Sequence, residues 1–142
     1  MAKKISELDA ASVPLVGSEQ LEIVQGGQSK RVAASDLLFG GHVDVPTTSR
    51  TLALTDAGAY LRHTNAATST VTVPLQSSVA WLSNTEITIR RAAGANLALT
   101  AEAGVTLNAP SGGTLVMTNG MTVTLKRVDV DIWDVIGQTV AA

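Results

Sequence analysis

The chain has 142 residues and a formal net charge of −2, with 10 lysines and arginines against 12 aspartates and glutamates. The basic residues are scattered, whereas a phosphate backbone requires a concentrated positive surface, so nucleic acid is not expected as a partner. The absence of cysteine excludes disulfides, thiolate zinc sites and cysteine nucleophiles. No apolar run has the length of a secretory signal or a membrane span, so we expect no membrane partner and a product that stays soluble in the cell that makes it.

Aromatic side chains are scarce. Hydrophobic residues make up 45% of the chain, but aromatic residues make up only 3%: Phe39, Tyr60, Trp81 and Trp133. Aromatic rings bury the most area per residue, so a core of alanine, valine, leucine and isoleucine must be built from many small contacts. We therefore expect a single chain to be short of core material and sister subunits to supply the rest.

The first forty residues predict a small separate unit. Residues 21–25 and 29–33 flank Gly26 and Gly27, which is the composition of a β-hairpin with a tight turn. Ser35 and Asp36 then precede an apolar triplet ended by two glycines, which favours one capped helical turn over 35–39. A linker at 40–48 contains Pro46. Residues 1–46 are thus predicted to form an N-terminal arm with a β-hairpin and a linker.

A shift in composition marks the second unit. No threonine occurs before Thr47, and threonine then recurs every few residues beside valine, leucine or isoleucine. These residues favour half-buried, pleated backbone, so residues 47–142 are predicted to form a β-rich oligomerising domain. Alternating apolar and polar residues predict strands at 52–55, 70–73, 86–90, 97–100, 105–107 and 132–136.

The strongest local signal is a second hairpin. Asn119-Gly120 lies between the alternating runs 114–118 and 121–126, and this dipeptide is typical of two-residue hairpin turns. No segment places apolar residues at helical spacing over several turns. We therefore predict a mostly β fold: a small, antiparallel, hairpin-rich β-sandwich or barrel-like domain with a short N-terminal arm, assembling as a trimer.

Few residues are arranged for chemistry. The only two histidines, His42 and His63, lie in no pattern typical of a base, a metal pair or a triad, and a surface or interface role is expected for each. Asp129, Asp131 and Asp134 form the only acidic cluster. A calcium ion is conceivable there, but the spacing lacks the glycine and the further ligand of a calcium loop, so a solvated turn is favoured. No metal or cofactor is expected.

An enzyme acting on polysaccharide is also disfavoured. Glycoside hydrolysis requires two carboxylates in a cleft, and Glu86 and Glu102 lie in a short domain with few rings to stack a sugar. Trp81 and Trp133 could form sugar platforms, but each lies after or within an alternating apolar stretch, which favours the core or a subunit contact. The residues predicted to lie in the core or at a subunit interface are Trp81, Trp133, Tyr60, Met121, Val123 and Leu125.

Several segments resemble known phage proteins. Residues 4–8 (KISEL), 21–27 (LEIVQGG), 30–32 (KRV) and 35–37 (SDL) resemble the opening module of phage tail-fibre and head-fibre proteins. Residues 52–60 (LALTDAGAY), 70–74 (TVTVP), 85–89 (TEITI), 104–108 (GVTLN) and 123–125 (VTL), leading to Trp133, resemble a β domain of phage fibres and capsid-surface proteins. One departure is the turn at 129–131, where relatives more often carry glycine or asparagine.

The resemblance implies a non-enzymatic virion structural protein, made in the host cytoplasm and carried on the particle surface. Because no long shaft separates the opening module from the compact domain, we expect a homotrimeric capsid decoration or head fibre. Its implied partners are its own copies and virion proteins such as the major capsid protein. The alternative is a short tail fibre or tail adaptor that binds a receptor or host-surface glycan. The residues expected to attach the arm are Ile5, Leu8, Leu21, Ile23, Val24, Val32, Leu37 and Leu38.

Overall fold

The computed structural model describes residues 20–33 and 41–142, and the chain divides into two compact units, 1–39 and 40–142. In the first unit, β1 (Gln20–Gln25) pairs antiparallel with β2 (Gln28–Ala33). Gly26 and Gly27 join the strands with φ of 62° and 74°, the left-handed conformation that such a turn requires. The predicted hairpin is confirmed. The helical turn predicted over 35–39 lies outside the described residues.

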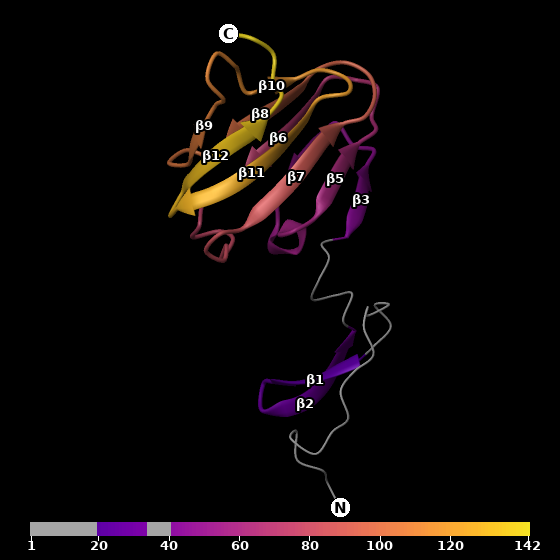
Figure 1. Cartoon of the computed structure of the whole chain (residues 1–142), viewed down its shortest axis with the longest axis vertical. Coiled ribbons are helices and arrows are strands. Elements are labelled where there is room, and N and C mark those ends of the chain that lie inside the picture. The colour runs from indigo at the N-terminus through magenta and orange to yellow at the C-terminus, as the bar shows by residue number, and fades with distance from the viewer. Residues whose placement is uncertain (1–19, 34–40) are drawn as a thin grey trace, which may run out of the picture. The chain divides into compact units, whose positions relative to one another are not determined.

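The second unit consists of a six-stranded and a four-stranded sheet (Figure 1). The larger sheet has the order β3 (His42–Val45), β5 (Tyr60–His63), β7 (Glu86–Arg91), β11 (Thr122–Asp129), β12 (Ile132–Gly137) and β9 (Thr106–Asn108). The smaller sheet has the order β10 (Val116–Met117), β8 (Leu97–Ala101), β6 (Ser69–Val73) and β4 (Ser49–Thr51). The prediction of a mostly β chain is confirmed, and no α-helix occurs in the described ranges.

From β3 to β8 the chain passes alternately from the larger sheet to the smaller one. As a result, β3, β5 and β7 pair in parallel in one sheet, and β4, β6 and β8 pair in parallel in the other. One passage of the chain through both sheets is a coil, and each coil stacks on the previous one. A 3₁₀ turn (Leu54–Asp56) lies between β4 and β5, where the first coil ends and the second begins. β10, β11 and β12 then extend the sheets through antiparallel pairs, and β9 pairs in parallel with β12 at the edge of the larger sheet.

The prediction of an antiparallel, hairpin-rich domain was therefore wrong for the coiled part. Alternation of apolar and polar residues specifies a strand with two different faces, but it does not specify the direction of the neighbouring strand. Connections of a few residues across the stacked sheets bring equivalent positions of successive coils together, as at Val71 and Leu99. The coil, and not the hairpin, is the repeating element.

The predicted Asn119-Gly120 hairpin was also wrong. Gly120 does occupy a turn, with φ of 91°. However, β10 before the turn pairs with β8 in the smaller sheet, whereas β11 after it pairs with β7 and β12 in the larger sheet. The turn carries the chain between sheets because β8 and β7 already offer edges on which each segment can pair.

Two short strands lie where the sequence predicted a linker or loop. β3 (His42–Val45) falls within the predicted linker at 40–48, yet it pairs with β5 and forms one edge of the larger sheet. β4 (Ser49–Thr51) forms an edge of the smaller sheet and is followed by the 3₁₀ turn where a strand was predicted. β3 buries Val45 in the core, whereas β4 is short and polar, so the pairing of β4 depends on its neighbour β6 and not on its own composition.

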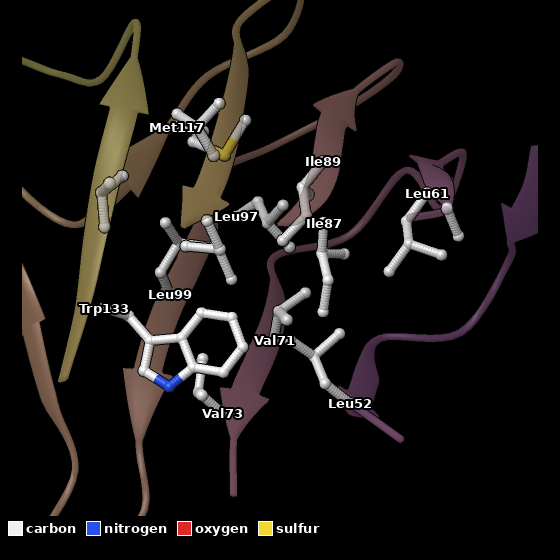
Figure 2. Packing of buried hydrophobic residues seen from close by; sticks show 14 of the residues in the cluster. Leu52, Leu61, Val71, Val73, Ile87, Ile89, Leu97, Leu99, Met117 and Trp133 are labelled. Atoms are coloured by element: carbon white, nitrogen blue, oxygen red, sulfur yellow. The ribbon is translucent and has the colours of Figure 1, made fainter. Parts of the chain in front are cut away.

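The core lies between the two sheets, and one chain fills it (Figure 2). Among the described residues, sixteen hydrophobic side chains are buried, and Trp81 and Trp133 contact edge to face with ring centroids 5.3 Å apart. Inward side chains of adjacent strands stack on one another, as Leu61 does on Ile89. The expectation that a single chain could not complete its interior was wrong, because a narrow space between sheets suits aliphatic residues.

The corners between the sheets also stack. In the second coil the corner covers residues 64–68 and in the third it covers 92–96; Ala95 donates its backbone N–H to the Ala66 carbonyl (3.0 Å) and Ser69 donates to Asn96 (2.9 Å). Gly94 lies at the closest approach with φ of 75°, and a Cβ atom there would overlap the Ala66 backbone. Glycine is therefore required for the corners to pack.

Gly94→Ala is expected to destabilise the fold more than Gly120→Ala does. Both glycines have positive φ, but a Cβ atom at Gly120 meets nothing within 4 Å. The conformational cost of alanine, about 1 kcal/mol, is common to both variants, and overlap with Ala66 should add about 2 kcal/mol for Gly94→Ala alone. Urea unfolding of both variants measures the difference. Equal losses of unfolding free energy would show that the corners do not pack as described.

Candidate interaction surfaces

The outer face of the larger sheet is charged. Side chains alternate between core and exterior along each strand, so the residues between the buried ones project outward. The charged residues that project from this face are Asp44, Arg62, Glu86, Arg90, Lys126 and Asp134. His42 and Tyr60 lie beside each other on the same face, with ring centroids 6.2 Å apart.

These charges are paired in the plane of the face. Lys126 Nζ lies 2.7 Å from Glu86 Oε1, and Arg62 Nη1 lies 3.3 Å from Asp44 Oδ1. Arg90 donates to the Gly120 carbonyl and to the Thr122 hydroxyl, both at 3.2 Å. Exposed pairs of this kind contribute little to stability. Ile136, the register partner of Thr124, is also 57% exposed on this side, so the face combines paired charges with an exposed aliphatic side chain.

The outer face of the smaller sheet carries no charge in the part of the chain that the structure describes. The registers align the outward positions of neighbouring strands into cross-strand rows. The outward residues of the three parallel strands are Ser49, Thr51, Thr70, Thr72, Ala98 and Thr100. Val116 of β10 extends the row next to Ala98. We call this surface the uncharged face.

The uncharged face has a signal in the sequence that our prediction missed. No Asp, Glu, Lys or Arg occurs in residues 64–85, 92–101 or 103–125. These stretches contain β6, β8 and β10 with their corners, and also β9 and the start of β11 in the larger sheet, whereas charges recur in β3, β5, β7, β12 and the rest of β11. The gaps in charge could be read from the sequence, but only the coil shows that β6, β8 and β10 lie side by side in the smaller sheet.

The β1–β2 hairpin has one apolar face. The register pairs Leu21 with Val32 and Ile23 with Lys30, so Leu21, Ile23 and Val32 share a face. Glu22 pairs with Arg31 on the opposite face. Leu21 is 46% exposed and Ile23 is 37% exposed, so the hairpin presents aliphatic side chains to solvent.

The remaining predicted residues fall in different places. Trp81, Trp133, Val123 and Leu125 belong to the core, while Tyr60 projects from the charged face and Met121 is half-buried. Neither tryptophan can serve as an exposed sugar platform. Val24 is 75% exposed on the opposite face of the hairpin from Ile23. Ile5, Leu8, Leu37 and Leu38 lie outside the described residues.

The three aspartates near the β11–β12 turn make separate contacts. Asp131 has φ of 55° and accepts the Gln76 backbone N–H at 2.6 Å. Asp134 accepts from Asn108 at 2.8 Å, and Asp129 accepts the Val130 N–H at 2.7 Å. Within the described ranges, no group of three His, Cys, Asp or Glu residues is placed to hold a metal ion. The carboxylates hold the turn and its neighbouring loops.

An open pocket of about 310 Å³ lies between the 110–113 loop and the C-terminal residues. Its lining includes Gly112, Gly113, Met121 and Gln138, and no charged residue takes part. Such a pocket offers backbone groups, small side chains and the hydroxyls of Ser111 and Thr139, but no histidine or charged residue to activate a hydroxyl or anchor a ligand.

A buried arginine and a buried histidine lie side by side near a corner of the core. Arg91 is fully buried and donates to the carbonyls of Ala95 and Ala67, both at 2.6 Å, and to the Ser69 hydroxyl at 3.3 Å. His63, the register partner of Arg91, is also fully buried, and neither ring nitrogen has a partner among the described residues. Burial first, and then the charges of Arg91 and Arg50, lower the pKa of His63 to about 4. The surface role expected for His63 was therefore wrong.

Comparisons with models of protein families, with curated proteins and with solved structures returned no match. Among the described residues, no helix combines the length and apolar character that a membrane crossing needs.

His63 should make the fold sensitive to mild acid. When the chain unfolds, His63 regains a pKa near 6.5, so between pH 6.5 and 4 the unfolded state binds more protons than the folded state. Stability therefore falls as the pH falls through this window, by about 2 kcal/mol between pH 7 and pH 5. Urea unfolding at the two pH values measures the loss.

His63→Leu removes the titrating group from the same buried position and is the matched control. Its unfolding free energy should change much less between pH 7 and pH 5. If the variant and the parent chain lose the same stability, His63 is not the group that senses acid.

Proposed function

We propose that the protein is a non-enzymatic structural protein of a bacteriophage particle, a homotrimeric capsid decoration or head fibre attached through its N-terminal arm. The family resemblance of segments in both units is the starting point for this proposal. The division of the chain into a small unit and a larger β unit agrees with an attachment element joined to a folded body.

The exposed apolar face of the β1–β2 hairpin carries the proposal. A two-stranded hairpin is marginally stable alone, and aliphatic side chains on one face gain stability when a partner covers them. Leu21 and Ile23 lie together on that face and remain exposed. A hairpin of this kind suits docking onto a surface of another virion protein, for which the major capsid protein is the proposed partner.

The attachment role predicts that Ile23→Asp in the full-length chain prevents labelling of particles. A carboxylate on the apolar face would be desolvated in the docked state, so binding should fall at least about 100-fold. The phage particles are produced in the host that carries the gene. Immunogold electron microscopy then measures how many particles carry the protein.

Ser29→Asp is the control for this test, because Ser29 pairs with Val24 on the opposite face of the hairpin. It should leave labelling unchanged. Full labelling by Ile23→Asp would remove the hairpin face as the attachment site, and failure of the unmodified chain to label any particle would remove the virion role.

A second candidate function is a short tail fibre or adaptor that binds a host-surface glycan. The observation that favours it is the pair of His42 and Tyr60 rings beside Arg62 on the charged face, because a ring can stack on a sugar while a guanidinium binds its polar groups.

The hypothesis of glycan binding predicts that Tyr60→Ala abolishes retention of the protein on host-cell polysaccharide while the fold persists. Thr70→Ala, on the opposite side of the domain, should retain binding. Retention that survives Tyr60→Ala would exclude this face as the glycan site; circular dichroism of both variants checks the fold.

A further inference from the structure

We propose that the uncharged face of the smaller sheet is the surface through which copies of this chain associate. The inference deepens the proposed function, on which it rests, because it assigns a surface to the proposed homotrimer.

The distribution of charge carries the argument. In residues 41–142, six charged side chains project from the larger sheet, whereas the outward residues of β4, β6, β8 and β10 are serine, threonine, alanine and valine. Soluble domains usually intersperse charges over their whole surface. Depletion of charged residues is the compositional mark of the buried centre of a protein interface. One side of this domain therefore shares the charge depletion of a surface that another protein covers, although threonine, serine and alanine stand there in place of the aromatic residues that enrich interface centres.

The two threonine hydroxyls at the centre of the face are already hydrogen-bonded within the chain. The hydroxyls of Thr72 and Thr100 hydrogen-bond each other at 2.9 Å, and the Thr100 hydroxyl also lies 3.2 Å from the Val71 carbonyl, to which it can donate. Burying a hydroxyl costs free energy mainly when its hydrogen bond to water is not replaced. Removing water from this face leaves these bonds in place, so the methyl groups of threonine and alanine can be covered at low cost.

The face continues onto the C-terminal residues. Val140 donates its backbone N–H to Val116 and Thr114 donates to Val140, both at 2.8 Å. The last residues of the chain therefore pair along the free edge of β10, and residues 135–142 carry no charged side chain. The uncharged surface is wider than the four strands of the sheet.

The occupant that this chemistry favours is a second copy of the chain. A charged partner surface would lose its hydration against threonine and alanine without gaining an opposite charge. The covering surface should therefore be uncharged as well, and the uncharged faces of other copies, turned toward a common threefold axis, meet this requirement. Symmetric assembly of identical subunits is also the commonest form of association in soluble proteins.

The test compares one substitution on each face of the full-length chain. Thr72→Lys introduces a charge at the centre of the uncharged face. Thr124→Lys introduces the same charge on the larger sheet, where Thr124 bonds Thr88 (3.2 Å) as Thr72 bonds Thr100, and both positions are half-buried. Sedimentation velocity across a concentration series measures association. Thr72→Lys should weaken it at least about 100-fold, and Thr124→Lys should change it by less than about threefold.

Ala98→Glu, at a neighbouring outward position, is a second variant of opposite charge, and the thermal unfolding midpoint of each variant confirms that it folds. A monomeric unmodified chain at all concentrations, or folded Thr72→Lys and Ala98→Glu proteins that associate as the parent does, would overturn the inference. Particle labelling is scored separately. A monomeric chain that labels particles would contradict this inference and leave the virion role standing. An oligomer that labels no particle would support this surface and contradict the virion role.

Discussion

In-register parallel stacking of successive coils determines where the side chains of the larger unit point. Because β5 pairs with β7 and β6 with β8 without a shift, each residue stacks on a residue that faces the same way. Leu61 meets Ile89 in the core while Arg62 meets Arg90 outside. A slip of one residue would exchange the two sets. The register therefore fixes the core and both outer faces together, and corners such as the one at Gly94 must be thin enough to let the coils approach.

The same stacking explains how a chain with so few aromatic residues completes its interior. Two sheets packed face to face leave a layer about 10 Å thick, which interdigitating leucine, valine and isoleucine side chains can fill. Trp81 and Trp133 then need to fill only one region of that layer, where they contact each other. Scarcity of aromatic residues is thus compatible with a self-sufficient subunit. An oligomer is therefore not needed to complete the interior, and it is the composition of the outer faces that favours one.

Much of the fold could be predicted from the sequence, and the errors have a common cause. Alternation located the strands around Val71, Ile89 and Leu99, and the two glycines located the first hairpin, because these signals are local. The partners of each strand were not predictable, since parallel pairing joins residues about 28 positions apart, as Thr70 and Ala98. The Asn119-Gly120 turn gave a wrong hairpin prediction for the same reason: β8 and β7, which pair with the segments before and after it, are distant in the sequence. A surface or interface role was expected for His63, whereas the pairing of β5 with β7 places it on the inward side with Leu61 and beside Arg91.

The choice of threonine on the uncharged face matters as much as the lack of charge. A face of leucine or isoleucine would drive non-specific aggregation before subunits could meet correctly. Threonine offers a methyl group for contact and a hydroxyl that neighbouring strands can bond, as Thr72 and Thr100 do. A subunit with this face remains wettable when alone and loses little when covered. The charged pairs on the opposite sheet, such as Glu86 with Lys126, keep that side hydrated in either state. The two faces together favour association on one side of the domain and exposure to solvent on the other.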